Sequence, residues 1–93
     1  MPLTVVLPRA LQPYSKGAGA LLVDEPCLTV SDALSAVRQR WPAVIDRVMT
    51  ERGEVREHVN IFVGDESIRF ARGLDTPVGD GDTIMIVAAV SGG

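Results

Sequence analysis

The final segment of the chain decides its fold: residues 83–93 read Thr-Ile-Met-Ile-Val-Ala-Ala-Val-Ser-Gly-Gly. Residues 83–90 are apolar at both alternating sets of positions, a pattern typical of a strand that is covered on both faces. We therefore expect this strand to lie in the centre of a sheet, parallel to the first strand of the chain. Ser91, Gly92 and Gly93 have almost no side chain to pack, so we expect them to form a flexible tail beyond the sheet.

Shorter strand patterns occur elsewhere in the sequence. Residues 3–8 and 20–23 are rich in aliphatic and β-branched side chains, and we expect them to form a hairpin with a long loop. Residues 59–63 alternate as a strand, Gly64 opens a turn, and residues 67–70 are expected to form a short returning strand. The chain thus supplies four to five strands.

The segment between these strands has helical periodicity. The apolar residues spaced i, i+3, i+4, i+7 and i+11 on one helix face are Val30, Ala33, Leu34, Val37 and Trp41. Thr29 followed by Asp32 is the pattern of a capping box at the start of a helix. Pro42 ends this helix and can open a second, shorter one, which we expect Gly53 to terminate.

The element order predicts an α+β fold, with one main helix packed across one face of a mixed sheet. We expect a single domain over residues 1–93, of which residues 91–93 form the tail. The residues expected to make most of the core are Leu3, Val5, Leu7, Leu22, Leu34, Val37, Trp41, Ile61, Ile84 and Ile86.

Composition excludes several classes of protein. The chain has 93 residues, 46% of them hydrophobic and 23% charged, which suits one small domain. The net charge is −3 and no basic cluster is visible, which argues against nucleic-acid binding. The sequence has no long apolar run and no signal layout, so we expect no membrane insertion and a cytoplasmic location. One cysteine, Cys27, and one histidine, His58, exclude an internal disulfide and a four-ligand zinc site of these residues.

The tail is the candidate functional element. Three extended residues project about 10 Å, and residues without bulky side chains fit a narrow channel in a partner enzyme. The carboxylate of Gly93 is ionised at neutral pH and is a poor electrophile, so acyl chemistry there needs activation, most simply by ATP on another protein. A frayed end without function is the alternative interpretation.

A second candidate is a docking surface on the sheet. Phe62, Met85 and Val87 fall out of register with the expected core residues, which places them with Val6 on the face away from the helix. An exposed apolar patch of this kind is a common partner site. The alternative is that the loop of residues 71–79 partly buries the patch.

Several short motifs occur within this element order. They are Val59-Asn60-Ile61-Phe62-Val63, Arg69-Phe70, Gly73-Leu74, Asp80-Gly81-Asp82 and Ala89-Val90-Ser91-Gly92-Gly93. With these motifs the whole chain resembles the ubiquitin-like β-grasp sulfur carriers of the ThiS and MoaD type. Within that family it is most similar to the actinobacterial cysteine-biosynthesis carriers of the CysO type and to carriers that serve secondary-metabolite pathways. One departure is that many relatives carry a proline where this chain has Ala88-Ala89, which leaves the choice of partner open.

The resemblance implies a function for the tail. Gly93 would be adenylated by a ubiquitin-activating-type enzyme, an adenylyltransferase and sulfurtransferase that uses ATP, and would become a thiocarboxylate. The thiocarboxylate would then donate sulfide to a sulfur-accepting synthase of cysteine or secondary-metabolite biosynthesis. Gly92 and Ser91 would serve tail recognition, and a JAMM-type metalloprotease is a further partner that the resemblance admits. The protein would be a monomeric cosubstrate with no bound cofactor, no metal and no catalytic residue of its own.

Two other functions remain open at this stage. A ubiquitin-like modifier would join Gly93 to a lysine through an isopeptide bond, and a plain β-grasp interaction module would not use its Gly-Gly end. Cys27 could serve as a nucleophile, although we expect it to be passive. The metabolite that receives the sulfur is not specified by the sequence.

Overall fold

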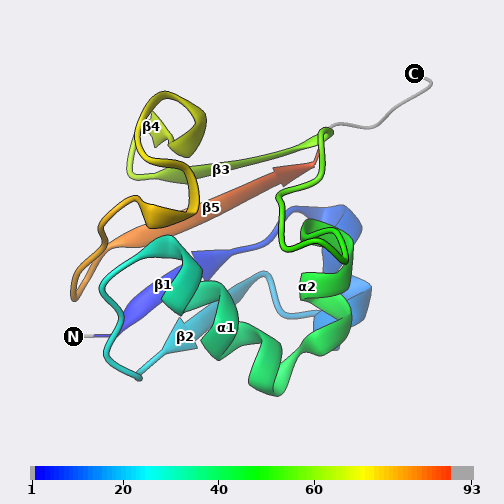
Figure 1. Cartoon of the computed structure of the whole chain (residues 1–93). Helices are drawn as coiled ribbons and strands as arrows, with labels where there is room; N and C mark the ends of the chain where they lie inside the picture. Colours follow the sequence, from blue (N-terminus) through cyan, green and yellow to red (C-terminus); the bar gives the residue numbers. More distant parts are fainter. Residues whose placement is uncertain (1, 89–93) are drawn as a thin grey trace.

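The computed structural model describes residues 2–88, which form a five-stranded mixed sheet with helices on one face (Figure 1). The strands are β1 (Leu3–Val6), β2 (Ala20–Val23), β3 (Val59–Val63), β4 (Glu66–Ser67) and β5 (Thr83–Ala88), in the spatial order β2-β1-β5-β3-β4. β5 is parallel to β1 and antiparallel to β3, so the predicted central position and direction of the last strand are confirmed. The β-grasp fold class is confirmed with them. Residues 89 and 90 of the expected strand lie outside the described residues.

The register of the central strands stacks their aliphatic side chains into one layer. Val5 lies opposite Ile84, and Ile61 lies opposite Ile86. Because successive side chains of a strand point to opposite faces, these four residues face the helices together, and all four are buried. This layer forms the middle of the core.

Two α-helices cover this layer, α1 (Val30–Arg40) and α2 (Pro42–Val48). The predicted capping box is present at the start of α1: the Asp32 backbone N–H donates to Thr29 Oγ1 at 3.2 Å, and the Thr29 N–H donates to Asp32 Oδ2 at 3.2 Å. α2 begins at Pro42, as predicted. Figure 1 shows both helices on the same side of the sheet.

Two residues of the expected core are placed differently. Leu22 is 57% exposed, because β2 turns its neighbours Leu21 and Val23 inward and sets Leu22 opposite Thr4 on the outer face. All four residues of β2 are apolar, so the sequence carries no alternation that could fix the phase of the strand. Trp41 follows the last residue of α1 and is half-buried against the core.

The strand expected over residues 67–70 is mostly a different structure. β4 contains only two residues, and the chain then forms a 3-10 helix, η2 (Ile68–Phe70). Ser67 caps this helix by accepting the Arg69 backbone N–H at 3.3 Å, a local bond that competes with the continuation of the strand. A further short helix, η3 (Gly73–Asp75), follows.

Two connections also differ from expectation. The long loop of the first hairpin contains a 3-10 helix, η1 (Arg9–Ser15), which the sequence pattern did not indicate. Gly53, at φ +80°, does not cap α2, which ends at Val48 with Met49 in an extended conformation. Gly53 instead lies in the turn where the Thr50 N–H donates to the Glu54 carbonyl at 2.7 Å.

A pair of leucine truncations tests this packing. Leu34 on α1 is 3% exposed, so Leu34→Ala should lower the free energy of unfolding by about 2 to 5 kcal/mol, because it removes buried methyl groups and leaves a cavity. Leu22→Ala, on the outer face, should change stability by less than about 1 kcal/mol. Denaturant titration measures both values. Equal losses in the two variants would contradict the assignment of the faces.

Candidate functional site

The last described element before the tail is the central strand β5. Ser91, Gly92 and Gly93 lie outside the described residues, and the described chain leads to them through β5, which ends at Ala88. Ala88 lies opposite Val59 of β3, and β1 pairs with the other edge of β5. The tail therefore follows a strand that β1 pairs with over residues 83–85 and that β3 pairs with as far as Ala88, the kind of rigid element that positions a functional group well.

The four predicted docking residues come together on the outer face of the sheet. Met85 lies opposite Val6 in β1 and opposite Phe62 in β3. Met85 and Val87 are 43% and 40% exposed, and the other two side chains are partly exposed. Their use by a partner stays a prediction.

The alternative placed the patch under the loop of residues 71–79. That loop instead packs on the helix side, where the Val30 backbone N–H donates to the Thr76 carbonyl at 3.0 Å and Leu74 contacts the core. The exposure of Met85 and Val87 agrees with this placement.

The outer face as a whole carries no ionisable side chain on the four longer strands. Its outward residues are Thr4, Val6, Ala20, Leu22, Asn60, Phe62, Thr83, Met85 and Val87, and each is partly or well exposed. Because burying a charge is costly, a surface without charges can be covered by a partner at a low desolvation cost. The face is chemically suited to docking.

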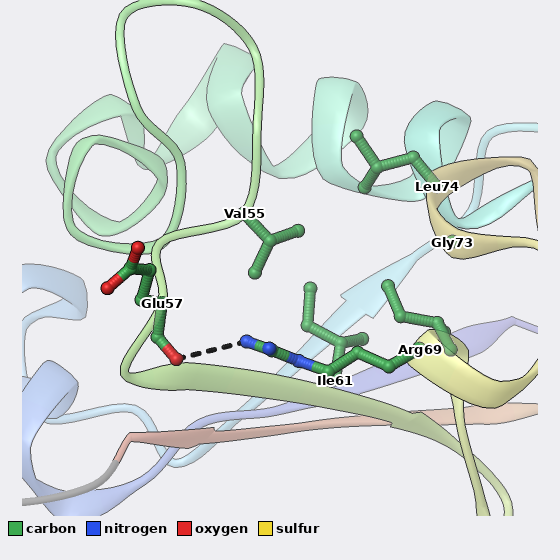
Figure 2. Close-up of a pocket in the computed structure, with 7 residues that line it drawn as sticks. Val55, Glu57, Ile61, Arg69, Gly73 and Leu74 are labelled. Atoms are coloured by element: carbon green, nitrogen blue, oxygen red, sulfur yellow. Dashed lines mark hydrogen bonds between the residues drawn. The ribbon is translucent and has the colours of Figure 1, made fainter.

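Arg69 of η2 organises the region beside the start of β3. A hollow of about 300 Å³ lies between the segment that precedes β3 and the loop of η2 and η3. Figure 2 shows the residues that line it. The residues that line it are Val55, Glu57, Ile61, Ile68, Arg69, Gly73 and Leu74. The Arg69 guanidinium extends toward the segment before β3 and donates to the backbone carbonyl of Glu57 at 3.0 Å. Arg69 thus ties the η2 loop to the beginning of β3.

Cys27 is placed as a passive residue. Its thiol is half-buried and donates to the backbone carbonyl of Glu25 at 3.3 Å. Burial, together with the nearby carboxylates of Asp32 and Glu25, raises the pKa of the Cys27 thiol. The thiol is therefore protonated at neutral pH and is a weak nucleophile.

Metal binding finds no support in the part of the chain that the structure describes. Within residues 2–88, no group of three or more His, Cys, Asp and Glu side chains is arranged to hold a metal ion. His58 is exposed in the segment before β3. None of the helices in the same range is long and apolar enough to cross a membrane.

Sequence reasoning missed several exposed apolar residues, of which Leu22, Leu28 and Phe70 are the most exposed. Leu22 extends the outer face onto β2, and Phe70 is 86% exposed at the end of η2. In a strand made only of apolar residues, such as β2, the sequence does not indicate which side chains face the core and which face solvent. Phe70 follows a strand-like pattern in sequence, and only the change to a 3-10 helix leaves it in solvent.

Comparison with known proteins gives one consistent result. The sequence model of the ThiS family matches residues 5–93. The sulfur carrier protein CysO of Mycobacterium tuberculosis is 33% identical over 95 residues, covering 100% of both chains. A chain from the crystal structure of the Amycolatopsis orientalis BexX/CysO complex is 33% identical with a TM-score of 0.85, covering 98% of this chain and 99% of that one. SAMP1 of Haloferax volcanii is 29% identical with a TM-score of 0.83, covering 100% of both chains.

The environment of Cys27 predicts its reactivity. Since the folded protein favours the neutral thiol, alkylation by iodoacetamide at neutral pH should be slower than that of a free cysteine, and its rate should rise only at a pH above the ordinary thiol range. Glu25→Gln removes one nearby negative charge and should shift the rate profile toward lower pH. The rate is followed by mass spectrometry across pH, with urea-unfolded protein as the control. A profile that matches that of the unfolded protein would contradict the assignment.

Proposed function

This chain belongs to the ThiS family, and from that premise we propose that it is a sulfur carrier whose C-terminal Gly93 is adenylated and then converted to a thiocarboxylate. The observation that carries the proposal is the sequence Ser91-Gly92-Gly93, which follows the central strand β5 along the chain after two intervening residues. The similarity to CysO over the full length of both chains supports it.

The proposed chemistry uses the Gly93 carboxylate twice. On a ubiquitin-activating-type enzyme, a carboxylate oxygen attacks the α-phosphorus of ATP, so that an acyl adenylate forms and pyrophosphate leaves. A sulfide donor on the same enzyme then attacks the activated carbonyl carbon, a C–S bond forms, and AMP leaves with the carboxylate oxygen. The product is a thiocarboxylate, whose sulfur is a soft nucleophile for transfer to an acceptor. ATP belongs to the activating enzyme, and this chain supplies the carboxylate and the recognition surfaces.

The fold suits this role through tethering. A tail of a few residues on a rigid strand keeps the reactive group close to the docked surface, and Gly92 and Ser91 are small enough for a narrow channel. A docked carrier therefore presents sulfur at a high effective concentration compared with free sulfide.

We propose that the outer face of the sheet docks the partner enzymes. Met85 lies at its centre between Val6 and Phe62, with Val87 beside it, and the face has no charge to desolvate. The similar chain from Amycolatopsis orientalis was solved in a BexX/CysO complex, which supports docking on an enzyme as the working mode of this chain. The partners proposed are the activating enzyme, a sulfur-accepting synthase and a JAMM-type metalloprotease that acts on the tail.

The modifier function is the second candidate. It is supported by the similarity of this chain to SAMP1, whose name stands for small archaeal modifier protein 1. The two functions differ in their product. A carrier cycles between carboxylate and thiocarboxylate, whereas a modifier accumulates as conjugates of higher mass in cell extract.

Intact-mass spectrometry tests the proposed reaction. The protein is incubated with ATP, a sulfide source and its activating enzyme, and we expect one oxygen of the C-terminal peptide to be replaced by sulfur. Fragmentation must place the change on Gly93, because Cys27 also reacts with thiol reagents. Gly93→Ala should block the exchange and leave the melting temperature unchanged. No exchange with an enzyme that activates a control carrier would contradict the proposal.

A charge placed on the outer face tests docking. Met85→Glu puts a carboxylate at the centre of the face, so its burial under a partner should weaken binding of the activating enzyme by about tenfold or more. Gln39→Glu adds the same charge at an exposed position of α1, on the opposite side of the sheet, and should bind like the wild type. Calorimetry with the activating enzyme gives both affinities. Equal affinities would remove the outer face from the proposal.

A further inference from the structure

The edge of β3 that faces away from β5 is only partly covered by a strand. The Gly64 backbone N–H donates to the Thr83 carbonyl at 3.0 Å, and in an antiparallel ladder every second residue repeats this pattern. The backbone groups of Phe62 and Asn60 therefore point toward β5, while those of Ile61 and Val59 point to the other side. On that side β4 is too short, since it pairs only with residues 62 and 63.

Side chains take the place of the missing strand. The Ile61 N–H donates to Asn60 Oδ1 at 3.0 Å, and Ser67 Oγ donates to the same oxygen at 2.8 Å. The Val59 N–H donates to the Arg56 carbonyl at 3.0 Å, and the Val59 carbonyl accepts from Arg69 Nη2 at 2.7 Å. Arg69 thus makes the backbone contact that a longer β4 would have made.

The same guanidinium group holds more than one carbonyl. Arg69 Nη2 also lies within 3.0 Å of the Glu57 carbonyl and 3.5 Å of the Arg56 carbonyl. Hydrogen bonds from a charged donor are stronger than those between neutral groups. One side chain therefore fixes the path of the chain into β3, as Figure 2 shows for its contact with Glu57.

This fixed segment lies opposite the last described residue of β5. Val59, the residue with the shortest contact to Arg69, is opposite Ala88 at the end of β5. We propose that Arg69 is a positioning residue for Gly93: by holding the start of β3 in place, it keeps Val59 paired with Ala88, the last described residue of β5, from which the chain leads to Gly93. The inference rests on the proposed function, because it matters only if the enzyme must reach Gly93.

Loss of Arg69 should loosen the end of β5. Without the Arg69 guanidinium, the Val59 carbonyl loses its hydrogen-bond donor, and no neighbouring strand can replace it. The pairing of Val59 with Ala88, and then of Asn60 with Val87, should therefore open more often. A longer free segment lets the Gly93 carboxylate occupy a larger volume around the docked carrier. The reaction is then slowed because fewer bound complexes hold the carboxylate in the reactive geometry.

Hydrogen exchange followed by NMR tests the first half of the proposal. In Arg69→Met the amide of Val87 should exchange about tenfold faster or more, while the amide of Ile84, further back along β5, keeps its protection. Arg69→Lys retains a charged donor and should restore part of the protection at Val87. The matched control is Arg72→Met, because the Arg72 side chain is exposed and makes no hydrogen bond or ion pair within residues 2–88. Unchanged exchange at Val87 in Arg69→Met, or equal changes in both methionine variants, would overturn the proposal.

Steady-state adenylation, measured with the carrier as the varied substrate, tests the second half. At a temperature where every variant is folded, Arg69→Met should lower kcat severalfold with little change in KM, and Arg69→Lys should recover part of kcat. A role confined to stability would leave both constants at the wild-type values, and that result would overturn the positioning role. If the wild type itself is not adenylated, the proposed function fails, and the exchange data still decide whether Arg69 holds the end of β5.

Discussion

The pairing of β5 with a neighbour on each side is the constraint on which the structure depends. Because β5 lies between β1 and β3, the chain must pass across the sheet from β2 to β3, and α1 and α2 lie along this path over the inner face. Antiparallel pairing with β3 fixes the side of β5 that faces away from β1. A strand held in this way can be apolar on both faces, so Ile84 and Ile86 build the core while Met85 and Val87 remain available to a partner.

The sequence was sufficient for the features that depend on a strong local pattern. The two-sided apolar run of β5, and Thr29 followed by Asp32, predicted the central strand and the capped helix that the structure shows. Leu22 was placed in the core wrongly because all four residues of β2 are apolar, so the sequence does not indicate which of them face inward. The strand predicted over residues 67–70 was wrong because Ser67 caps the 3-10 helix η2, which replaces most of it. The role of Arg69 could not be predicted, because its partners are backbone carbonyls. Every residue has one, so the sequence does not indicate which of them Arg69 contacts. Of the predicted site, the outer-face residues were placed correctly, and the tail lies outside the described residues.

The chemical roles are divided between separate parts of the molecule. The inner face of the sheet is buried, the outer face of the four longer strands is uncharged, and the charged side chains lie on the helices, the loops and β4. Burial, together with the nearby carboxylates of Asp32 and Glu25, raises the pKa of Cys27, the single thiol of the chain, and so keeps it protonated. This arrangement suits the proposed thiocarboxylate chemistry, because an unreactive thiol does not compete for the same reagents.

The short β4 has a consequence for solubility. An open sheet edge offers unpaired backbone groups to other chains, and an uncharged sheet face would add to that attraction. Here Asn60 and Arg69 occupy the backbone groups along the exposed edge of β3, and at the opposite edge Arg40 Nη1 donates to the Leu22 carbonyl at 3.5 Å. Backbone groups on both borders of the sheet are thus already hydrogen-bonded, which lowers the tendency of these edges to add a strand from another chain.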